Sequence, residues 1–495
     1  MYSHNQLIFP SHLEKNSRFL VLAGFSLNGP VGTPFGLRDG VDPYEVLGNC
    51  PMAENLVIAR QYGITPLILR LNGTHGEATL MHEEQGVPVL RFKTVEAHDE
   101  CNNIMIHLFP THMVVKGLYT SYSYYFADYK NLHEMVFAIN QHHAFAQGEI
   151  EVEILNALPL SGLCITEKYL SFENADDGYH YMTTPEDTED KMQMQLELLR
   201  GSMIEGEGND LYYAGELIGY TTDTVVFTDI PYEKAPAALT SIFGEFAKAK
   251  TEEQNLFCSV IIGSDYFSGP RLDENEEDTY TGAVLALLDY KNQLAEGTYL
   301  QHIEVVLGSQ DAINAEKGAV SCAASYASMR FSQLKFYESA TNKGLPTVGS
   351  LLSKELEQDE VAKLSGSGYI CIVPSIKKGF VPFSSKNLYS QYPLFSKPNY
   401  LRSIHYDVRR ITGFFNQHIG EPLSITLLQS ILQQVNTFSE ELLDNHPLYK
   451  NLFIEVIDYS PQQVSLSLAF ELYGEVESIR TSFTYTPSSE VSVQW

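Results

Sequence analysis

The sequence has few cysteines, and none of them are paired in a motif. Its six cysteines are scattered, and no two stand in the Cys-x-x-Cys spacing of zinc sites and redox centres. This argues against a structural zinc site or a disulfide scaffold and favours buried free thiols. No apolar run approaches the roughly 20 residues that a membrane helix requires. The first residues also lack a basic segment followed by an apolar one, so no signal peptide is expected.

Positive charge is scarce. The chain holds 32 Lys and Arg against 62 Asp and Glu, which gives a formal net charge of −30. Such an acidic surface repels nucleic acid and anionic membranes, so we expect no direct nucleic-acid binding and no membrane insertion. It suits a protein that stays soluble or meets a basic partner. A length of 495 residues predicts two to four domains, and a hydrophobic content of 44% allows a sizeable core.

Recognisable catalytic and cofactor motifs are missing. Residues 24–29 follow a strand but lack the glycine spacing and the lysine of a phosphate-binding loop. His107 and His112, with His98 and Asp99 upstream, form no H-E-x-x-H motif, and surface or core histidines are the favoured interpretation. No G-x-S-x-G turn is present. We expect no catalytic residue, no metal and no cofactor, although a site assembled across the fold would escape such a search.

The acidic run at 273–278 resembles a calcium-binding loop only in composition. It lacks the glycine that such loops carry at their sixth position. Its charges directly precede a predicted helix at 280–294, and carboxylates at a helix N-terminus are stabilised by the helix dipole. The run is therefore interpreted as a solvated loop and helix start.

Strands and helices alternate in two parts of the chain, which is typical of an α/β sheet domain. The first part has strands at 19–25 and 65–71 around a helix at 51–62, and the second has strands at 256–263 and 303–308 with helices at 280–294 and 317–335. Between them, strands are expected at 87–92, 104–108 and 150–155, with a helix at 131–140. Residues 161–255 show helical patterns at 191–200 and 234–249 but no clear overall organisation.

The last third, from about Gly344, predicts a separate α+β module. Large apolar residues occupy every second position of 464–472, which places five of them on one face of a half-buried strand. Another strand is expected around 452–456, and a turn at 458–461 ends it. Two amphipathic helices lie upstream, one from Arg402 and one from Ser424, which is the expected N-cap of the second.

Both ends of the chain carry short β-prone segments. Apolar residues at 7–9 precede Pro10, and disorder is the more common outcome for such a terminus. Residues 482–485 alternate between polar and apolar, Pro487 breaks the run, and 490–495 alternate again with nothing left to pair with locally. A solitary β-prone tail is either frayed or borrowed by a neighbouring copy.

Two blocks of the chain resemble the contractile tail sheath family of bacteriophages and related contractile injection systems. Residues 19–34, FLVLAGFSLNGPVGTP, are similar to the family's strand ending in a Gly-Pro turn, and the similarity continues to Leu71. Residues 339–348, SATNKGLPTV, look like the family's "tNkpL.gv" segment and precede the helix 355–364, the strand 369–373 and the helix 400–417. The family commonly opens with a Pro-Gly-Val-Tyr-like arm, which here is reduced to Pro10 and short apolar residues.

The resemblance implies an α+β and α/β multidomain fold. It comprises a sheath core of mixed sheet flanked by helices, a C-terminal α+β module, inserted β-rich middle domains and extended terminal arms. The implied parts are an arm at 1–16, core at 17–80, a small α/β domain at 81–160, an inserted outward-facing region at 161–255, core at 256–343, the C-terminal module at 344–481 and an arm at 482–495.

The resemblance also implies a structural protein and not an enzyme. Sheath subunits of this family polymerise as stacked hexameric rings around an inner tail tube and contract to drive the tube through the host envelope for genome ejection. The implied partners are further copies of the chain, the tail tube protein, and baseplate and tail terminator proteins. The implied location is the virion, with assembly in the bacterial host cytoplasm. A non-contractile tail or surface assembly protein, and an α/β enzyme with its site in the middle region, remain alternatives.

In this family, terminal arms add strands to the C-terminal module of neighbouring subunits, which requires an alternating segment and an open sheet edge. The residues expected to make such contacts are Leu7, Ile8, Phe9, Phe483, Tyr485, Val491, Val493 and Trp495. Trp495 is the only tryptophan, and an exposed terminal residue is an equally good interpretation of it. The helix from Ser424 is implied to face the tube through Glu440, Glu441 and Asp444, with an ordinary solvated helix face as the alternative.

Overall fold

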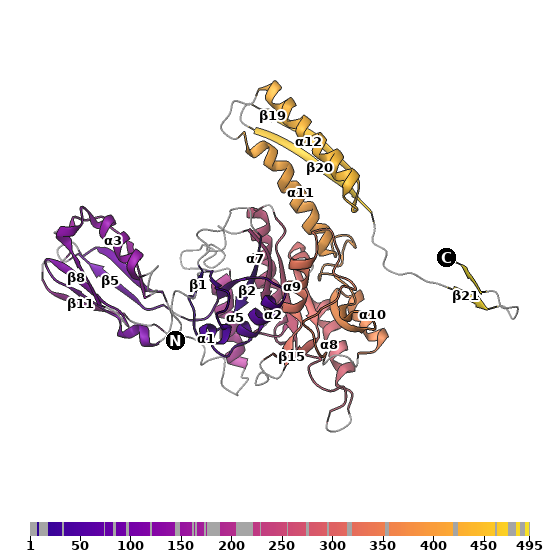
Figure 1. The fold of residues 1–495 in the computed structure, drawn as a ribbon, viewed down its shortest axis with the longest axis horizontal. Coiled ribbons are helices and arrows are strands. Elements are labelled where there is room, and N and C mark those ends of the chain that lie inside the picture. Colours follow the sequence, from indigo (N-terminus) through magenta and orange to yellow (C-terminus); the bar gives the residue numbers. More distant parts are fainter. Residues whose placement is uncertain are drawn as a thin grey trace. The chain divides into compact units, whose positions relative to one another are not determined.

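The computed structural model of the chain divides into two units, Met1–Pro398 and Asn399–Trp495, which are described separately (Figure 1). The C-terminal unit thus begins later than the module expected from about residue 344. Among the described residues, no helix is both long and apolar enough to span a membrane. The structure describes residues 7–8, 18–31, 34–73, 75–82, 86–95, 99–118, 121–143, 149–160, 163, 166–172, 175, 189–203, 221–227, 229–254, 256–273, 277–294, 297–313, 319–351, 356–418, 424–460, 463–473, 482–485 and 491–494.

A seven-stranded mixed sheet organises the first unit. Its strand order is β18-β17-β14-β13-β12-β2-β4, and all neighbours are parallel except β17 and β18. Every residue of β13 and β14 is buried, so helices cover both faces of the sheet. The strands are β2 (Arg18–Gly24), β4 (Leu67–Arg70), β12 (Thr221–Phe227), β13 (Ser259–Ser264), β14 (Ile303–Leu307), β17 (Tyr369–Ser375) and β18 (Gly379–Pro382).

Two groups of helices pack on this sheet. One group is α2 and α9, with α9 crossing β2, β12, β13 and β14. The other contains α7, which packs on β13 and β14 and against α5 and α8, while α10 packs on β17. The helices of the unit are α1 (Pro43–Leu47), α2 (Pro51–Gln61), α5 (Glu189–Met203), α7 (Pro236–Gln254), α8 (Thr279–Gln293), α9 (Ala323–Gln333) and α10 (Gln358–Gly366). The helix expected at 317–335 begins only at Ala323, because β16 (Ala319–Ser321) pairs with β15 (Ser309–Asp311).

Residues 221–254 differ from the inserted, outward-facing region expected for 161–255. Strand β12 lies in the middle of the seven-stranded sheet, between β13 and β2. Val225, Val226 and Phe227 are buried in the main core, together with Leu199 of α5 and Phe243 of α7. A central parallel strand is buried on both faces. Strand β12 is therefore part of the core sheet and does not belong to a separate inserted region.

A buried ion pair fastens α9 beneath this sheet. Arg330 of α9 contacts Glu304 of β14, and both side chains are almost completely buried. The Arg330 guanidinium also donates to Thr224 Oγ1 at 2.9 Å and Ser259 Oγ at 2.6 Å, while the Tyr326 hydroxyl donates to Glu304 at 2.9 Å. One helix is thereby hydrogen-bonded to three adjacent strands.

Residues 77–175 form two further antiparallel sheets around a hydrophobic core of their own. Phe92, Ile106 and Val115 belong to this second core. Asn131 caps α3 (Leu132–Asn140) by accepting a hydrogen bond from the Glu134 amide at 2.9 Å. The sheet β10-β6-β5 contains β5 (Glu77–Met81), β6 (Pro88–Thr94) and β10 (Ile150–Ile154); the sheet β11-β7-β8-β9 contains β7 (Met105–Leu108), β8 (His112–Lys116), β9 (Ser121–Tyr125) and β11 (Lys168–Ser171).

The C-terminal unit consists of two helices and a long two-stranded ribbon, β19 with β20. Its elements are α11 (Pro398–Asn416), α12 (Ile425–Asn445), β19 (Tyr449–Ser460), β20 (Gln463–Leu472), β21 (Ser482–Tyr485) and β22 (Val491–Gln494). The predicted N-cap of α12 is confirmed, since Ser424 Oγ accepts from the Leu427 amide at 3.1 Å. The turn expected at 458–461 is displaced, because β19 stays paired as far as Ser460. Together the two units confirm the predicted mixed α/β and α+β fold class.

Candidate assembly surfaces

The ribbon of the C-terminal unit has two open edges. Strands β19 and β20 contain 12 and 10 residues and pair antiparallel, and among the described residues no third strand joins their sheet. Each outer edge therefore presents a row of backbone N–H and C=O groups that another strand can pair with. Figure 1 shows α12 running along the ribbon.

The two faces of the ribbon differ in burial. Leu468, Phe470 and Leu472 are half-buried, which agrees with the period of two in the sequence. On the opposite face, Phe453 pairs with Ala469, and both side chains are exposed. A two-stranded ribbon is only marginally stable by itself, so the helix-covered face holds it in place.

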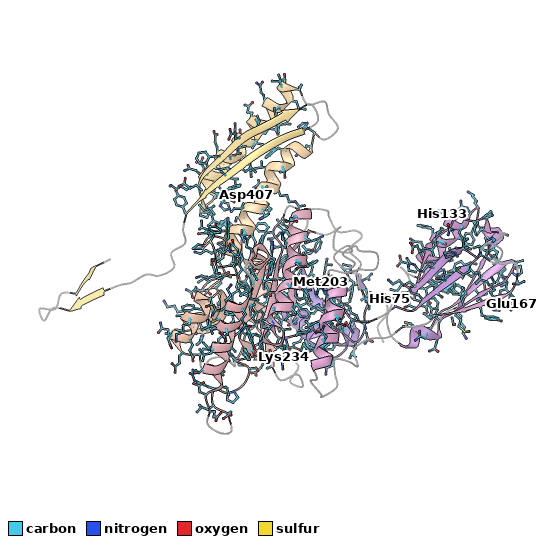
Figure 2. All side chains as sticks on the ribbon, turned by 180° about the vertical axis from the view of Figure 1, so that it is seen from behind. His75, His133, Glu167, Met203, Lys234 and Asp407 are labelled. Atoms are coloured by element: carbon cyan, nitrogen blue, oxygen red, sulfur yellow. The ribbon has the colours of Figure 1, made fainter. Side chains whose placement is uncertain are left out.

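A buried polar cluster fixes the base of the ribbon to α11. The Tyr449 hydroxyl donates to Asp407 Oδ2 at 2.6 Å, and the Tyr449 ring stacks on His446 with centroids 4.4 Å apart. The Tyr400 hydroxyl donates to the Tyr473 carbonyl at 2.8 Å. Asp407 is labelled in Figure 2. This cluster positions both the first residue of β19 and the residue that follows β20.

Burial governs protonation in this cluster. Desolvation raises the pKa of Asp407, although the hydrogen bond from Tyr449 opposes this shift. Desolvation lowers the pKa of His446 to about 4, so the imidazole is neutral at neutral pH. The approach of His446 Nε2 to Asp407 Oδ2 at 4.0 Å is therefore not an ion pair at neutral pH.

The C-terminal tail pairs with itself. Strand β21 pairs antiparallel with β22, with Phe483 opposite Val493 and Tyr485 opposite Val491. The expectation that 490–495 has nothing to pair with locally is therefore wrong, because the two segments form a hairpin. Trp495 lies outside the described residues. A role of these residues in contacts between copies stays a prediction.

The N-terminal segment pairs within its own unit. Leu7 and Ile8 form β1 (Leu7–Ile8), opposite Leu37 and Gly36 of β3 (Gly36–Leu37). Leu7 is buried in the main core, which differs from the disorder that is more common for a terminus. Phe9 lies outside the described residues. Contact of this segment with another copy also stays a prediction.

The end of α12 is acidic. Glu440, Glu441 and Asp444 are all exposed, and the last turn of the helix contains no basic residue. Carboxylates at a helix C-terminus are disfavoured by the helix dipole, so this end of α12 favours a positively charged neighbour. The tube-facing role expected for these three residues stays a prediction.

The histidines weighed as metal ligands serve other contacts. His107 Nε2 lies 2.6 Å from Glu167 Oε1, and the ring stacks on Tyr169 with centroids 3.8 Å apart. His112 stacks between Phe109 and Tyr125. Glu167 is labelled in Figure 2. Within the part of the chain that the structure describes, no group of three His, Cys, Asp or Glu side chains could hold a metal; His98 lies outside that part.

The acidic run at 273–278 begins α8, as the sequence predicts. Asp278 is the N-cap, and its Oδ1 accepts from the amides of Tyr280 at 3.0 Å and Thr281 at 3.1 Å. Arg271 contacts Asp278 at 2.8 Å and Glu360 at 3.0 Å. The hydrogen bond from the Thr281 amide, and after it the one from Arg271, lowers the pKa of Asp278.

Comparison with solved structures finds sheath proteins. A sheath tail protein from Desulfitobacterium hafniense is 14% identical, with a TM-score of 0.47, and the match covers 94% of this chain and 99% of that one. A sheath tail protein from Listeria innocua is 13% identical, with a TM-score of 0.48, covering 92% and 95%. The helical sheath of the anti-feeding prophage in its contracted state is 13% identical, with a TM-score of 0.40, covering 59% and 82%. No protein-family model and no curated protein sequence matches the chain.

Proposed function

We propose that this chain is the structural subunit of a contractile tail sheath, which polymerises as stacked hexameric rings around an inner tube. The observation that carries the proposal is the ribbon β19-β20, whose two outer edges are open among the described residues. A strand-forming tail follows it in the same unit. The sequence resemblance of residues 19–71 and 339–417 to the tail sheath family supports the same function.

Strand addition explains how such a subunit joins its neighbours. An extended arm from one copy pairs with an open ribbon edge of the next through main-chain hydrogen bonds. Each bond contributes only about 0.5–1.5 kcal/mol net, so an arm is held by several bonds and side-chain contacts acting together. Because β21 and β22 pair with each other, the tail can add to a neighbouring ribbon in two ways. Either the hairpin opens, or the hairpin docks intact through the outer edge of one of its strands.

Contraction requires connected bodies that can move. Arms that remain paired keep the subunits linked while the α/β bodies rotate and slide between two packing arrangements. New contacts between bodies then supply the energy that drives the tube through a host envelope. The acidic end of α12 supplies a weak, releasable contact with a basic tube surface.

Electron microscopy of the purified full-length chain tests this function directly. We expect long hollow tubes in negative stain. Isolated rings or flat lattices would indicate a non-contractile assembly protein instead. Monodisperse single copies that bind a cofactor would overturn the proposal in favour of an enzyme.

A further inference from the structure

The outer face of the sheet β11-β7-β8-β9 carries a continuous row of aromatic rings. Side chains alternate across this sheet, so Ile106 and Leu108 enter the second core while His107 between them lies on the opposite face. The members of the row, from one edge strand to the other, are Tyr169, His107, Phe109, His112 and Tyr125. The sheath function proposed above gives this row no role.

Each ring of the row lies against the next. The rings of Tyr169 and His107 are stacked with centroids 3.8 Å apart, and Phe109 follows His107 at 3.7 Å. Phe109 and His112 are stacked at 4.4 Å, and His112 and Tyr125 at 5.1 Å. The row therefore ends in one tyrosine on each edge strand, β11 and β9.

The two terminal tyrosines keep much of their surface open. Tyr169 is 65% exposed and Tyr125 is 52% exposed, although each has a ring stacked on one side. Strands β11 and β9 are separated by three spacings between neighbouring strands, roughly 14 Å. A ligand that contacts both tyrosines is therefore an extended molecule.

A carboxylate stands beside the Tyr169 end of the row. Glu167 Oε1 lies 2.6 Å from His107 Nε2 and accepts a hydrogen bond from the Tyr169 hydroxyl at 3.2 Å. The Glu167 side chain, labelled in Figure 2, is still 52% exposed, and an ionised carboxylate accepts several hydrogen bonds. Every ring of the row except Phe109 also carries a nitrogen or an oxygen. The row thus combines aromatic surface with hydrogen-bonding groups.

We propose that this row binds a neutral oligosaccharide. The C–H groups on one face of a pyranose ring pack on an aromatic ring, and the sugar hydroxyls donate to a carboxylate. Tyrosine suits this contact because it combines a large apolar ring with a polar tip. Tyr169 and Tyr125 are the stacking residues, and Glu167 accepts from a hydroxyl of the sugar that lies on Tyr169.

Charge separates this ligand from the other extended molecule that stacks on aromatic residues. Single-stranded nucleic acid places its bases on aromatic side chains within a positively charged groove. This chain carries a net charge of −30, which repels a polyanion, and none of the residues of the row is a lysine or an arginine. A neutral oligosaccharide meets no such repulsion.

Calorimetric titration of the full-length chain with cellohexaose and with chitohexaose tests this site. Both oligosaccharides are uncharged, and their β-linked rings present flat C–H faces. We expect at least one of them to bind with a millimolar or lower dissociation constant. The affinity should not change between low and high salt, because the ligand has no charge to screen.

Variants of the terminal tyrosines locate the binding. Tyr169→Leu keeps an apolar side chain beside His107 but removes the open ring, and it is expected to weaken binding roughly tenfold. Tyr125→Leu makes the same change on the other edge strand. Phe137→Leu is the matched control, since Phe137 of α3 is also 65% exposed and is not a member of the row. It should bind like the wild-type chain.

Each result has a defined meaning once circular dichroism shows that the variants are folded. A wild-type chain that binds neither oligosaccharide overturns the proposal. So does Tyr169→Leu binding as tightly as Phe137→Leu; if Tyr169→Leu does not fold, Tyr125→Leu supplies the same comparison. Tighter binding of oligodeoxythymidylate than of either oligosaccharide also overturns it. Sugar binding does not require polymer formation, so these results leave the proposed sheath function to its own test.

Discussion

The strands of the seven-stranded sheet and those of the C-terminal ribbon differ in how many neighbours they pair with. In the sheet, β13 and β14 are flanked by other strands and buried at every residue. In the ribbon, β19 and β20 have only each other among the described residues, although both are longer than any strand of the sheet. The first arrangement completes its hydrogen bonding within one chain. The second leaves backbone groups available to another strand, which is why the proposed contact between copies is placed at the ribbon.

Removing the tail is expected to have the largest effect, because it should affect the ribbon's contacts and not the folding of the sheet. Deleting residues 483–495 is expected to abolish polymer formation, because the strand-forming tail is lost, while the α/β unit stays folded. Negative-stain microscopy measures the first effect and circular dichroism the second. Unchanged polymers in the deletion variant would refute the role of the tail in joining copies.

Breaking the buried ion pair should damage the sheet unit and spare the ribbon. Arg330→Met leaves the Glu304 carboxylate buried without its cation, and the loss of one partner of a buried pair typically costs about 3–5 kcal/mol. Urea unfolding of the full-length chain measures the change. Arg330→Met combined with Glu304→Gln should be less destabilised than Arg330→Met alone; an equal or larger loss would show that the charge pair is not the cause.

Removing one hydroxyl should loosen the base of the ribbon. Tyr449→Phe deprives the buried Asp407 of its donor at 2.6 Å, which is expected to cost about 1–3 kcal/mol. Hydrogen exchange of residues 425–460 in the full-length chain should become faster, while exchange in β13 and β14 should not change. Faster exchange in both regions would show that the effect of the Tyr449 hydroxyl is not confined to the C-terminal unit.

Acid should weaken the C-terminal unit through His446. Its pKa is lowered to about 4 in the folded chain, so below the ordinary histidine value of about 6.5 the unfolded state binds the proton first. Stability contributed by the neutral imidazole therefore falls as pH decreases from about 6.5 toward 4. Asp407 acts in the opposite sense, because its raised pKa favours the protonated folded state as pH falls.

The variant His446→Asn isolates the histidine contribution. Hydrogen exchange of α12 in this variant should depend less on pH between 6.5 and 4 than in the wild-type chain. An unchanged pH dependence would assign the effect to other groups. This is the smallest of the expected effects, because a single half-buried group carries it.

Local patterns were sufficient wherever an element depends on its own residues. The period of two in 464–472 predicted β20, and Ser424 was identified as the N-cap of α12 because capping involves residues three apart. The strand–helix alternation of 256–335 predicted β13 and β14, two of the seven strands of the sheet. The acidic run at 273–278 was recognised as a helix start for the same reason.

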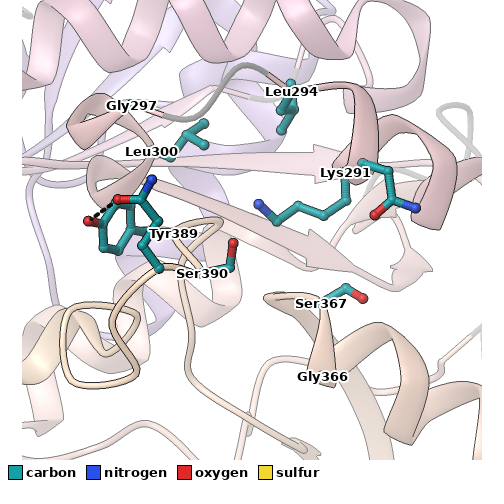
Figure 3. Close-up of a pocket in the computed structure, with 10 residues that line it drawn as sticks. Lys291, Leu294, Gly297, Leu300, Gly366, Ser367, Tyr389 and Ser390 are labelled. Atoms are coloured by element: carbon teal, nitrogen blue, oxygen red, sulfur yellow. Dashed lines mark hydrogen bonds between the residues drawn. The ribbon is translucent and has the colours of Figure 1, made fainter.

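Pairing between segments far apart in the chain could not be predicted from the sequence. Strand β12 mixes threonines with apolar residues, so its central place is visible only through its parallel partners β2 and β13. Strands β8 and β11 are short, and their exposed and buried positions make sense only beside β7. One cavity is lined by residues that no spacing rule connects, among them Lys291, Leu300, Ser367 and Tyr389 (Figure 3).

By itself, the sequence determined the acidic character of the chain, the alternation that builds its sheet, and the helices and strand period of its C-terminal unit. These follow from charge, from residue spacing and from contacts within a few residues. Only the tertiary structure decided that β12 stands at the centre of the sheet, that Arg330 meets Glu304, and that β21 folds back on β22. Such contacts depend on which distant segments share a surface, and the free energy of burial, not the local pattern, selects among the possible partners.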